Sequence, residues 1–139
     1  MSKYPSRQDR EELKALLNQY NNLKAGRSHS LIEEDEFERI IEYFDEKEQL
    51  TAALEAAEFA IEQYPFSSNL LLQKASFQIA LRLYQDALHT LEKAELYDGR
   101  NVDLFILKTE AFLALDMQEK AAEILESALD DFRGEEKTD

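Results

Sequence analysis

The chain has 139 residues, 44% apolar and 33% charged, with three Gly and two Pro among abundant Ala, Leu, Glu and Lys, which predicts one globular all-α domain. The absence of Cys excludes disulfides, Cys-ligated zinc and thiol catalysis. The net charge of −14 is uneven: six basic and three acidic side chains over residues 1–30 give +3, while ten and 27 over residues 31–139 give −17.

The first predicted helix spans residues 6–24, with Ser6 as its N-cap and Asp9 in its first turn. Its apolar and aromatic residues fall at helical spacing on one stripe: Leu13, Leu16, Leu17, Tyr20 and Leu23. A short break around Gly26 covers residues 25–29. The stretch from Ser30 to Glu33 then reads as a capping box, which predicts a helix to about Glu46. We expect four residues of this helix to face inward: Phe37, Ile40, Ile41 and Phe44.

Five further helices follow, each bounded by a cap or a stop residue. They are predicted over residues 49–63 before Pro65, from Ser67 or Ser68 to about 81, over 84–96 before Gly99, from the cap Asn101 over 102–115, and from the cap Asp116 to about 132. Residues 134–139 are expected to be a polar tail.

A 34-residue period underlies the three helix pairs, 34–67, 68–101 and 102–135. In each pair two alanines stand seven residues apart: Ala53 and Ala60, Ala87 and Ala94, Ala121 and Ala128. A fixed period of this length is typical of stacked-repeat proteins, because one pair cannot bury its own apolar face. We therefore expect these alanines to let the two helices of each pair approach closely, so that a bulky replacement overpacks the contact.

The period resembles the tetratricopeptide repeat (TPR) family over about 102 residues. At the large, small and aromatic positions of the family's first helix stand, repeat by repeat, Phe37, Ile41 and Phe44, then Leu71, Ala75 and Gln78, then Phe105, Thr109 and Phe112, where Ile41 is larger than usual and Gln78 is not aromatic. The alanine pairs, Tyr84 and Pro65 match the second helix and its end, whereas Lys74 and Lys108 stand where Leu is common. The resemblance implies an α-α solenoid of three repeats over 34–135, preceded by an amphipathic capping helix and linker (1–33) and followed by a tail (136–139).

The resemblance also implies a concave groove, lined by the first helices, that binds a peptide or protein segment. Transferred residue by residue, that groove consists of Asp35, Glu38, Glu42, Asp45, Asn69, Leu72, Ser76, Ile79, Asp103, Ile106, Glu110 and Leu113. Glu38 and Glu42 occupy positions where chaperone-binding members carry Lys or Asn, so an acidic peptide tail is an unexpected ligand. A basic or amphipathic segment suits the groove better, although the acidic stripe also reads as plain solvated surface.

Three features leave alternatives open. The helix at 6–24 either caps the first repeat or lies in the groove, basic against acidic. The apolar groove residues need cover by a partner peptide, by that helix or by a second subunit. The last helix, with Ile124, Leu125, Leu129 and Phe132, lacks the polar outer face of a terminal repeat, which favours either a homodimer or continuation into a longer solenoid.

No pattern predicts catalysis or a cofactor. His29 and His89 are the only histidines and no second metal ligand lies at usable spacing, and no phosphate-binding Gly loop or nucleophile motif is present. The acidic body repels nucleic acid and anionic lipid, and no apolar run is long enough to cross a membrane. We therefore expect a cytoplasmic, non-enzymatic interaction module, with a structural or self-associating scaffold as the alternative.

Overall fold

The computed structural model describes residues 6–29 and 31–136, and in the last helix it describes side chains as far as Asp131. Every regular element within this part of the chain is an α-helix, which confirms the all-α prediction. The helices divide into two compact units, Met1–Gln63 and Tyr64–Asp139, called here the N-terminal and C-terminal units. Among the described residues, no helix has the length and apolar character needed to cross a membrane.

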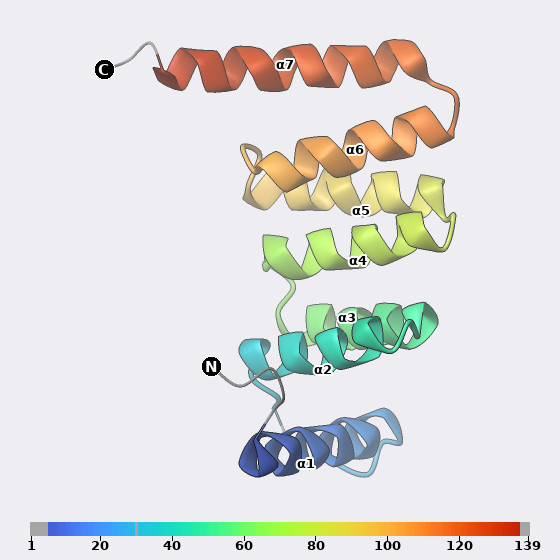
Figure 1. The fold of residues 1–139 in the computed structure, drawn as a ribbon, viewed down its shortest axis with the longest axis vertical. Helices are drawn as coiled ribbons and strands as arrows, with labels where there is room; N and C mark the ends of the chain where they lie inside the picture. Colours follow the sequence, from blue (N-terminus) through green and yellow to red (C-terminus); the bar gives the residue numbers. More distant parts are fainter. Residues whose placement is uncertain (1–5, 30, 137–139) are drawn as a thin grey trace. The chain divides into compact units, whose positions relative to one another are not determined.

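The N-terminal unit contains α1 (Arg7–Lys24), α2 (Glu34–Glu46) and α3 (Leu50–Gln63), shown in Figure 1. The predicted cap of α1 is confirmed, because Ser6 Oγ accepts a hydrogen bond from the Asp9 amide at 3.0 Å and Asp9 Oδ2 accepts one from the Ser6 amide at 3.3 Å. This reciprocal pair satisfies two backbone donors at the start of α1. Gly26, two residues after the end of α1, has φ +72, a left-handed conformation that Gly adopts without strain.

The start of α2 differs from the prediction. The helix begins at Glu34 with Glu33 as its N-cap, and Glu36 Oε1 accepts a hydrogen bond from the Glu33 amide at 3.0 Å. The box expected from Ser30 to Glu33 is thus displaced by three residues, and Ser30 itself lies outside the described residues. A Glu stands three residues after Ser30 and another stands three residues after Glu33, so the sequence fits a capping box at either position.

An aromatic cluster forms the core of the N-terminal unit. The Tyr20 side chain of α1 is 1% exposed, and its ring centroid lies 6.2 Å from that of Phe44 on α2 and 5.9 Å from that of Phe59 on α3. The ring pair with Phe59 is edge-on, a favourable geometry for aromatic side chains. The Lys24 ammonium also pairs with Glu55 of α3 at 2.5 Å. One side of α1 is therefore packed against both helices of the first pair.

The C-terminal unit contains α4 (Ser68–Ala80), α5 (Tyr84–Tyr97), α6 (Val102–Ala114) and α7 (Gln118–Glu136). Each helix packs against the next along the chain, and α4 also packs against α6. Two predicted N-caps are confirmed, since Ser67 Oγ accepts from the Leu70 amide at 3.3 Å and Asn101 Oδ1 from the Asp103 amide at 2.8 Å.

The start and end of α7 correct the prediction. Asp116 does not cap this helix, which begins at Gln118, and its φ of 59 places it in the left-handed region. The helix continues to Glu136, about one turn beyond the expected end near residue 132, so residues 134–136 of the predicted polar tail are helical. Residues 137–139 lie outside the described residues.

The turn inside each helix pair has the same backbone in all three pairs. The left-handed residues Glu48, Arg82 and Asp116 stand 34 residues apart, with φ of 58, 65 and 59. In each case the next residue donates its amide to a carbonyl five residues back, in the pairs Gln49 to Phe44, Leu83 to Gln78 and Met117 to Phe112. This is a Schellman motif, which usually employs Gly at the left-handed position. The period of the sequence is thus a period of backbone geometry.

The six periodic alanines are all buried. Ala53, Ala60 and Ala87 are 0% exposed, and Ala94, Ala121 and Ala128 are at most 8% exposed. The large first-helix positions are buried as well, at Phe37, Leu71 and Phe105. The packing role that the period predicts for these residues is confirmed.

Candidate functional site

The twelve predicted groove residues belong to the first helices of the three pairs, and the two units hold them separately. Four of them lie on α2 in the N-terminal unit, and eight lie on α4 and α6 in the C-terminal unit. The eight in the C-terminal unit include every apolar member of the set, so that unit is described first.

A hollow of about 240 Å³ lies between α4 and α6. Its lining combines residues from both helices: Asn69, Leu72, Gln73 and Ser76 from α4 with Asp103, Ile106 and Leu107 from α6. Five of the seven were predicted from the sequence, namely Asn69, Leu72, Ser76, Asp103 and Ile106. The spacing of three and four residues along each helix places these side chains on one face.

The hollow has an apolar base and an exposed apolar wall. Leu72 is 7% exposed, whereas Ile106 is 49% exposed although it is a large aliphatic residue. A half-exposed Ile beside a hollow retains apolar surface that a ligand can cover, which is a favourable contribution to binding. Leu113, one turn further along α6, is 53% exposed in the same way.

One residue that lines the hollow has a buried polar atom without a partner among the described residues. Gln73 Oε1 is buried, and no described residue donates a hydrogen bond to it. A buried carbonyl oxygen without a donor is costly, and such groups are uncommon in native proteins. The Asp103 carboxylate lies on the exposed side of α6 and adds a negative charge at the rim.

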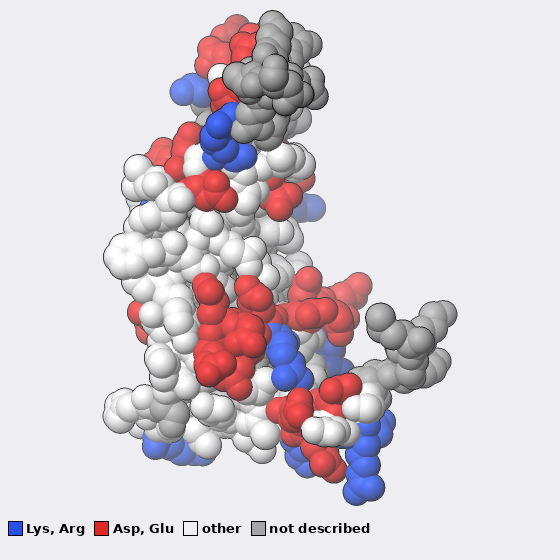
Figure 2. Space-filling model, turned by 90° about the vertical axis from the view of Figure 1, so that its left-hand side faces the viewer, with Lys and Arg blue, Asp and Glu red and all other residues white. Residues whose placement is uncertain are grey.

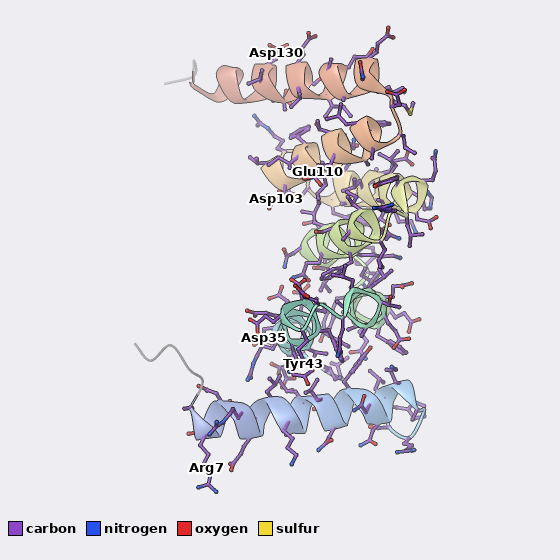
Figure 3. The ribbon with its side chains drawn as sticks, turned by 45° about the vertical axis from the view of Figure 1, so that its right-hand side comes forward. Arg7, Asp35, Tyr43, Asp103, Glu110 and Asp130 are labelled. Atoms are coloured by element: carbon purple, nitrogen blue, oxygen red, sulfur yellow. The ribbon has the colours of Figure 1, made fainter. Side chains whose placement is uncertain are left out.

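Gln73 and Leu107 were not predicted. Both stand beside a predicted position, four residues after Asn69 and one after Ile106, so the sequence places them next to the groove stripe. Their inclusion depends on how closely α4 and α6 pack, which a single helix pattern does not contain. Conversely, Ile79, Glu110 and Leu113 do not line the hollow: Ile79 is half-buried and the other two are exposed on α6. Figure 3 shows Asp103 and Glu110 on that helix.

The four predicted residues of the N-terminal unit do not form a common site. Glu42 lines a hollow of about 360 Å³ shared by α1 and α2, with Asp9, Arg10, Leu13, Arg39, Tyr43 and Glu46. Asp35 and Asp45 are exposed, Glu38 is half-buried, and none of these three lines that hollow. Tyr43 projects from α2 toward α1 in Figure 3, in agreement with its place in the lining.

The hollow between α1 and α2 carries charges of both signs. Arg39 of α2 approaches Glu12 of α1, with Nη1 and Oε2 at 3.9 Å, and Arg10 contributes a second guanidinium to the lining. The sequence predicted a basic first helix facing an acidic α2. In this ion pair the charges are reversed, because the basic residue, Arg39, belongs to α2 and the acidic residue, Glu12, belongs to α1. An exposed pair of this kind contributes little to stability.

Acidic side chains dominate the surface. Figure 2 shows Asp and Glu gathered into patches on one face, with Lys and Arg fewer and more scattered. This follows from 30 acidic against 16 basic residues in the sequence. Among the described residues no group of three or more His, Asp or Glu side chains is placed to hold a metal ion.

Comparison with protein-family models and with curated proteins gives no match for this chain. The candidate site therefore rests on its own geometry.

Proposed function

We propose that the chain is a non-catalytic protein-interaction module in which the hollow between α4 and α6 binds a peptide or protein segment. The observation that carries the proposal is the convergence of Leu72, Ile106 and Asp103 on one hollow between α4 and α6. Concave sites that combine apolar lining with a few polar groups are typical of ligand binding.

A TPR-like superhelix is part of the same proposal. The 34-residue spacing of the helix starts at Glu34, Ser68 and Val102, together with the three equivalent turns, supports a repeat architecture. The packing of Tyr20 between Phe44 and Phe59 supports α1 as a cap on the first pair rather than a groove occupant.

The chemistry of the hollow specifies its ligand. An apolar side chain covers Leu72 and Ile106, and a Lys or Arg lies near Asp103. The acidic surface attracts a basic segment at long range, and salt screens that attraction. The expected ligand is an amphipathic segment with an aliphatic side chain between basic ones.

The test uses synthetic 12-residue peptides with a fluorescent label and a central Leu flanked by Lys, Ser or Glu. Fluorescence anisotropy with the full chain measures their dissociation constants. We expect the Lys-flanked peptide to bind most tightly and to weaken with salt, and Ile106→Ser to weaken it about tenfold, as for a half-buried anchor residue.

Val102→Ser is the matched control, since Val102 lies one turn away on α6, is 51% exposed and does not line the hollow. Equal loss of affinity in the two variants, or no preference for flanking Lys, would refute this site.

The second candidate is a structural segment of a longer solenoid or a self-associating scaffold. Leu125 and Leu129 of α7 favour it, because they are 48% and 53% exposed on the last described helix. Light scattering distinguishes the two: a stable oligomer that binds none of the peptides supports the scaffold, whereas a peptide-binding monomer supports the interaction module.

A further inference from the structure

The two second helices of the C-terminal unit differ at one register position. Leu91 on α5 is 0% exposed, whereas Leu125, 34 residues later on α7, is 48% exposed. The flanking alanines stay buried in both helices, at Ala94 and at Ala128. The alanine positions thus keep their burial in both helices, while the position of Leu91 and Leu125 does not.

The neighbours of each helix account for this difference. α5 packs extensively against both α4 and α6, whereas among the described helices α7 packs extensively against α6. A helix with two neighbours buries a wide apolar face, and a helix with one leaves part of that face in solvent. α7 therefore presents the surface that its counterpart α5 uses for a second helix.

The register of the α5–α6 interface indicates what α7 contacts. Glu95 of α5 forms an ion pair with Lys108 of α6, which explains a Lys at a position where the TPR pattern has Leu. The residue of α7 equivalent to Glu95 is Leu129, which is 53% exposed. A helix docked on α7 in the same way faces Leu129 with an apolar side chain instead of Lys, because an ammonium against Leu loses its ion pair.

Charge further restricts which kind of helix can dock on α7. Along α7 an apolar row, Ala122, Leu125 and Leu129, runs beside an acidic row, Glu123, Glu126 and Asp130. All three acidic residues are exposed, and Figure 3 shows Asp130 on the side of α7 turned away from α6. Two copies of this face would oppose acidic rows to each other, whereas basic flanks on a different helix complement them.

We propose that the α7 outer face, formed by Ala122, Leu125 and Leu129 with the adjacent acidic row, docks an amphipathic helix of a partner protein. The partner helix has an apolar stripe, including the position that faces Leu129, and Lys or Arg along its flank. It extends the helix-on-helix packing of α5 and α6 by one further layer, and its site is distinct from the hollow between α4 and α6.

Three labelled 18-residue helical peptides test this proposal by fluorescence anisotropy with the full chain. The first has Leu at every third or fourth position with Lys on the flanks, the second has Glu on the flanks, and the third replaces the central Leu of the first by Lys. We expect the first to bind most tightly, and the double variant Leu125→Ser, Leu129→Ser to weaken it about tenfold or more.

Two controls assign the binding to the α7 outer face. Leu96→Ser alters a more exposed Leu on α5, which is 79% exposed, and should leave affinity unchanged. Ile106→Ser alters the hollow and should also leave it unchanged. If Ile106→Ser alone weakens the peptide, the peptide occupies the hollow and the α7 proposal is overturned.

Two further measurements keep the test decisive. Hydrogen exchange of the unmodified chain with the first peptide should slow over residues 118–131, a readout independent of whether the double variant folds. Sedimentation of the chain alone should show a monomer, and a dimer abolished by Leu129→Ser would replace the partner helix by a second copy and overturn the proposal.

Discussion

The N-terminal and C-terminal units share one turn geometry but connect their helices by different chemistry. In the N-terminal unit Phe44 of α2 packs against Tyr20 of α1, and Tyr20 also packs against Phe59 of α3. In the C-terminal unit the equivalent residue is Gln78, which is 7% exposed, and its Oε1 accepts a hydrogen bond from the Thr90 hydroxyl of α5 at 2.7 Å. An aromatic contact in one unit thus corresponds to a buried polar contact in the other.

This difference separates what the repeat requires from what each unit adds. The left-handed turn residue and the paired alanines recur in every pair, because they determine how closely two helices approach. The residue 34 positions from Phe44 differs, and so does the residue 34 positions before Thr90, which is Ala56 and is also buried.

The largest expected effect on stability comes from removing the Tyr20 side chain from the aromatic cluster of the N-terminal unit. Tyr20→Ala leaves a cavity beside Phe44 and Phe59 and should lower the free energy of unfolding by about 3–5 kcal/mol, as for other buried aromatic residues. Urea unfolding followed by circular dichroism measures it. A change below about 1 kcal/mol would show that α1 does not stabilise the first pair.

Tyr20→Phe is the matched variant. The Tyr20 hydroxyl is buried and has no hydrogen-bond partner among the described residues, so its removal should raise stability by about 1 kcal/mol. Burial, and secondarily the charge of Glu55, raises the pKa of Tyr20 above its ordinary value, so the folded state favours the neutral phenol. The original chain should therefore lose stability as the pH rises past about 10, and more steeply than Tyr20→Phe.

An intermediate effect is expected at the polar contact of the C-terminal unit. Thr90→Val removes the donor to Gln78 and should cost about 1–3 kcal/mol, because a buried acceptor is left unsatisfied. The double variant Gln78→Leu, Thr90→Val removes both polar groups and should recover most of that loss. Thermal unfolding of the original chain and of the two variants provides the measurement, and equal losses in the single and double variants would contradict this account.

The smallest effect concerns the turn that the units share. Arg82→Gly places the residue without a Cβ at a φ of 65 and should raise stability by about 0.5–1 kcal/mol, since Gly adopts this conformation without strain. Glu48→Gly makes the same change in the N-terminal unit and should give a similar gain. A gain in one unit alone would show that the two turns, though alike in geometry, are not equivalent in energy.

Much of the fold follows from the sequence, because helical periodicity, Pro65 and the caps Ser6, Ser67 and Asn101 are local features. The two errors at helix starts are also local in origin. A Glu-rich segment offers two frames for a capping box at Ser30 and Glu33, and a left-handed Asp116 cannot be told from an N-cap by residue type alone.

The candidate site follows from the sequence less completely. The stripe Asn69, Leu72 and Ser76 is periodic and was predicted, whereas Gln73 and Leu107 enter the hollow only through the packing of α4 on α6. Glu42 shares its hollow with α1, a contact between helices separated by a loop. Spacing along one helix cannot determine which side chains meet across two.

The packing of α7 has a consequence for the order in which the C-terminal unit unfolds. Among the described helices α7 packs extensively against α6, whereas α5 packs extensively against α4 and α6, so the amides of α7 should exchange before those of α5. A partner that binds folded α7 raises the free energy needed to unfold this helix. Occupancy of this face would then regulate how long the helix survives proteolysis, so that assembly and lifetime of the chain are coupled.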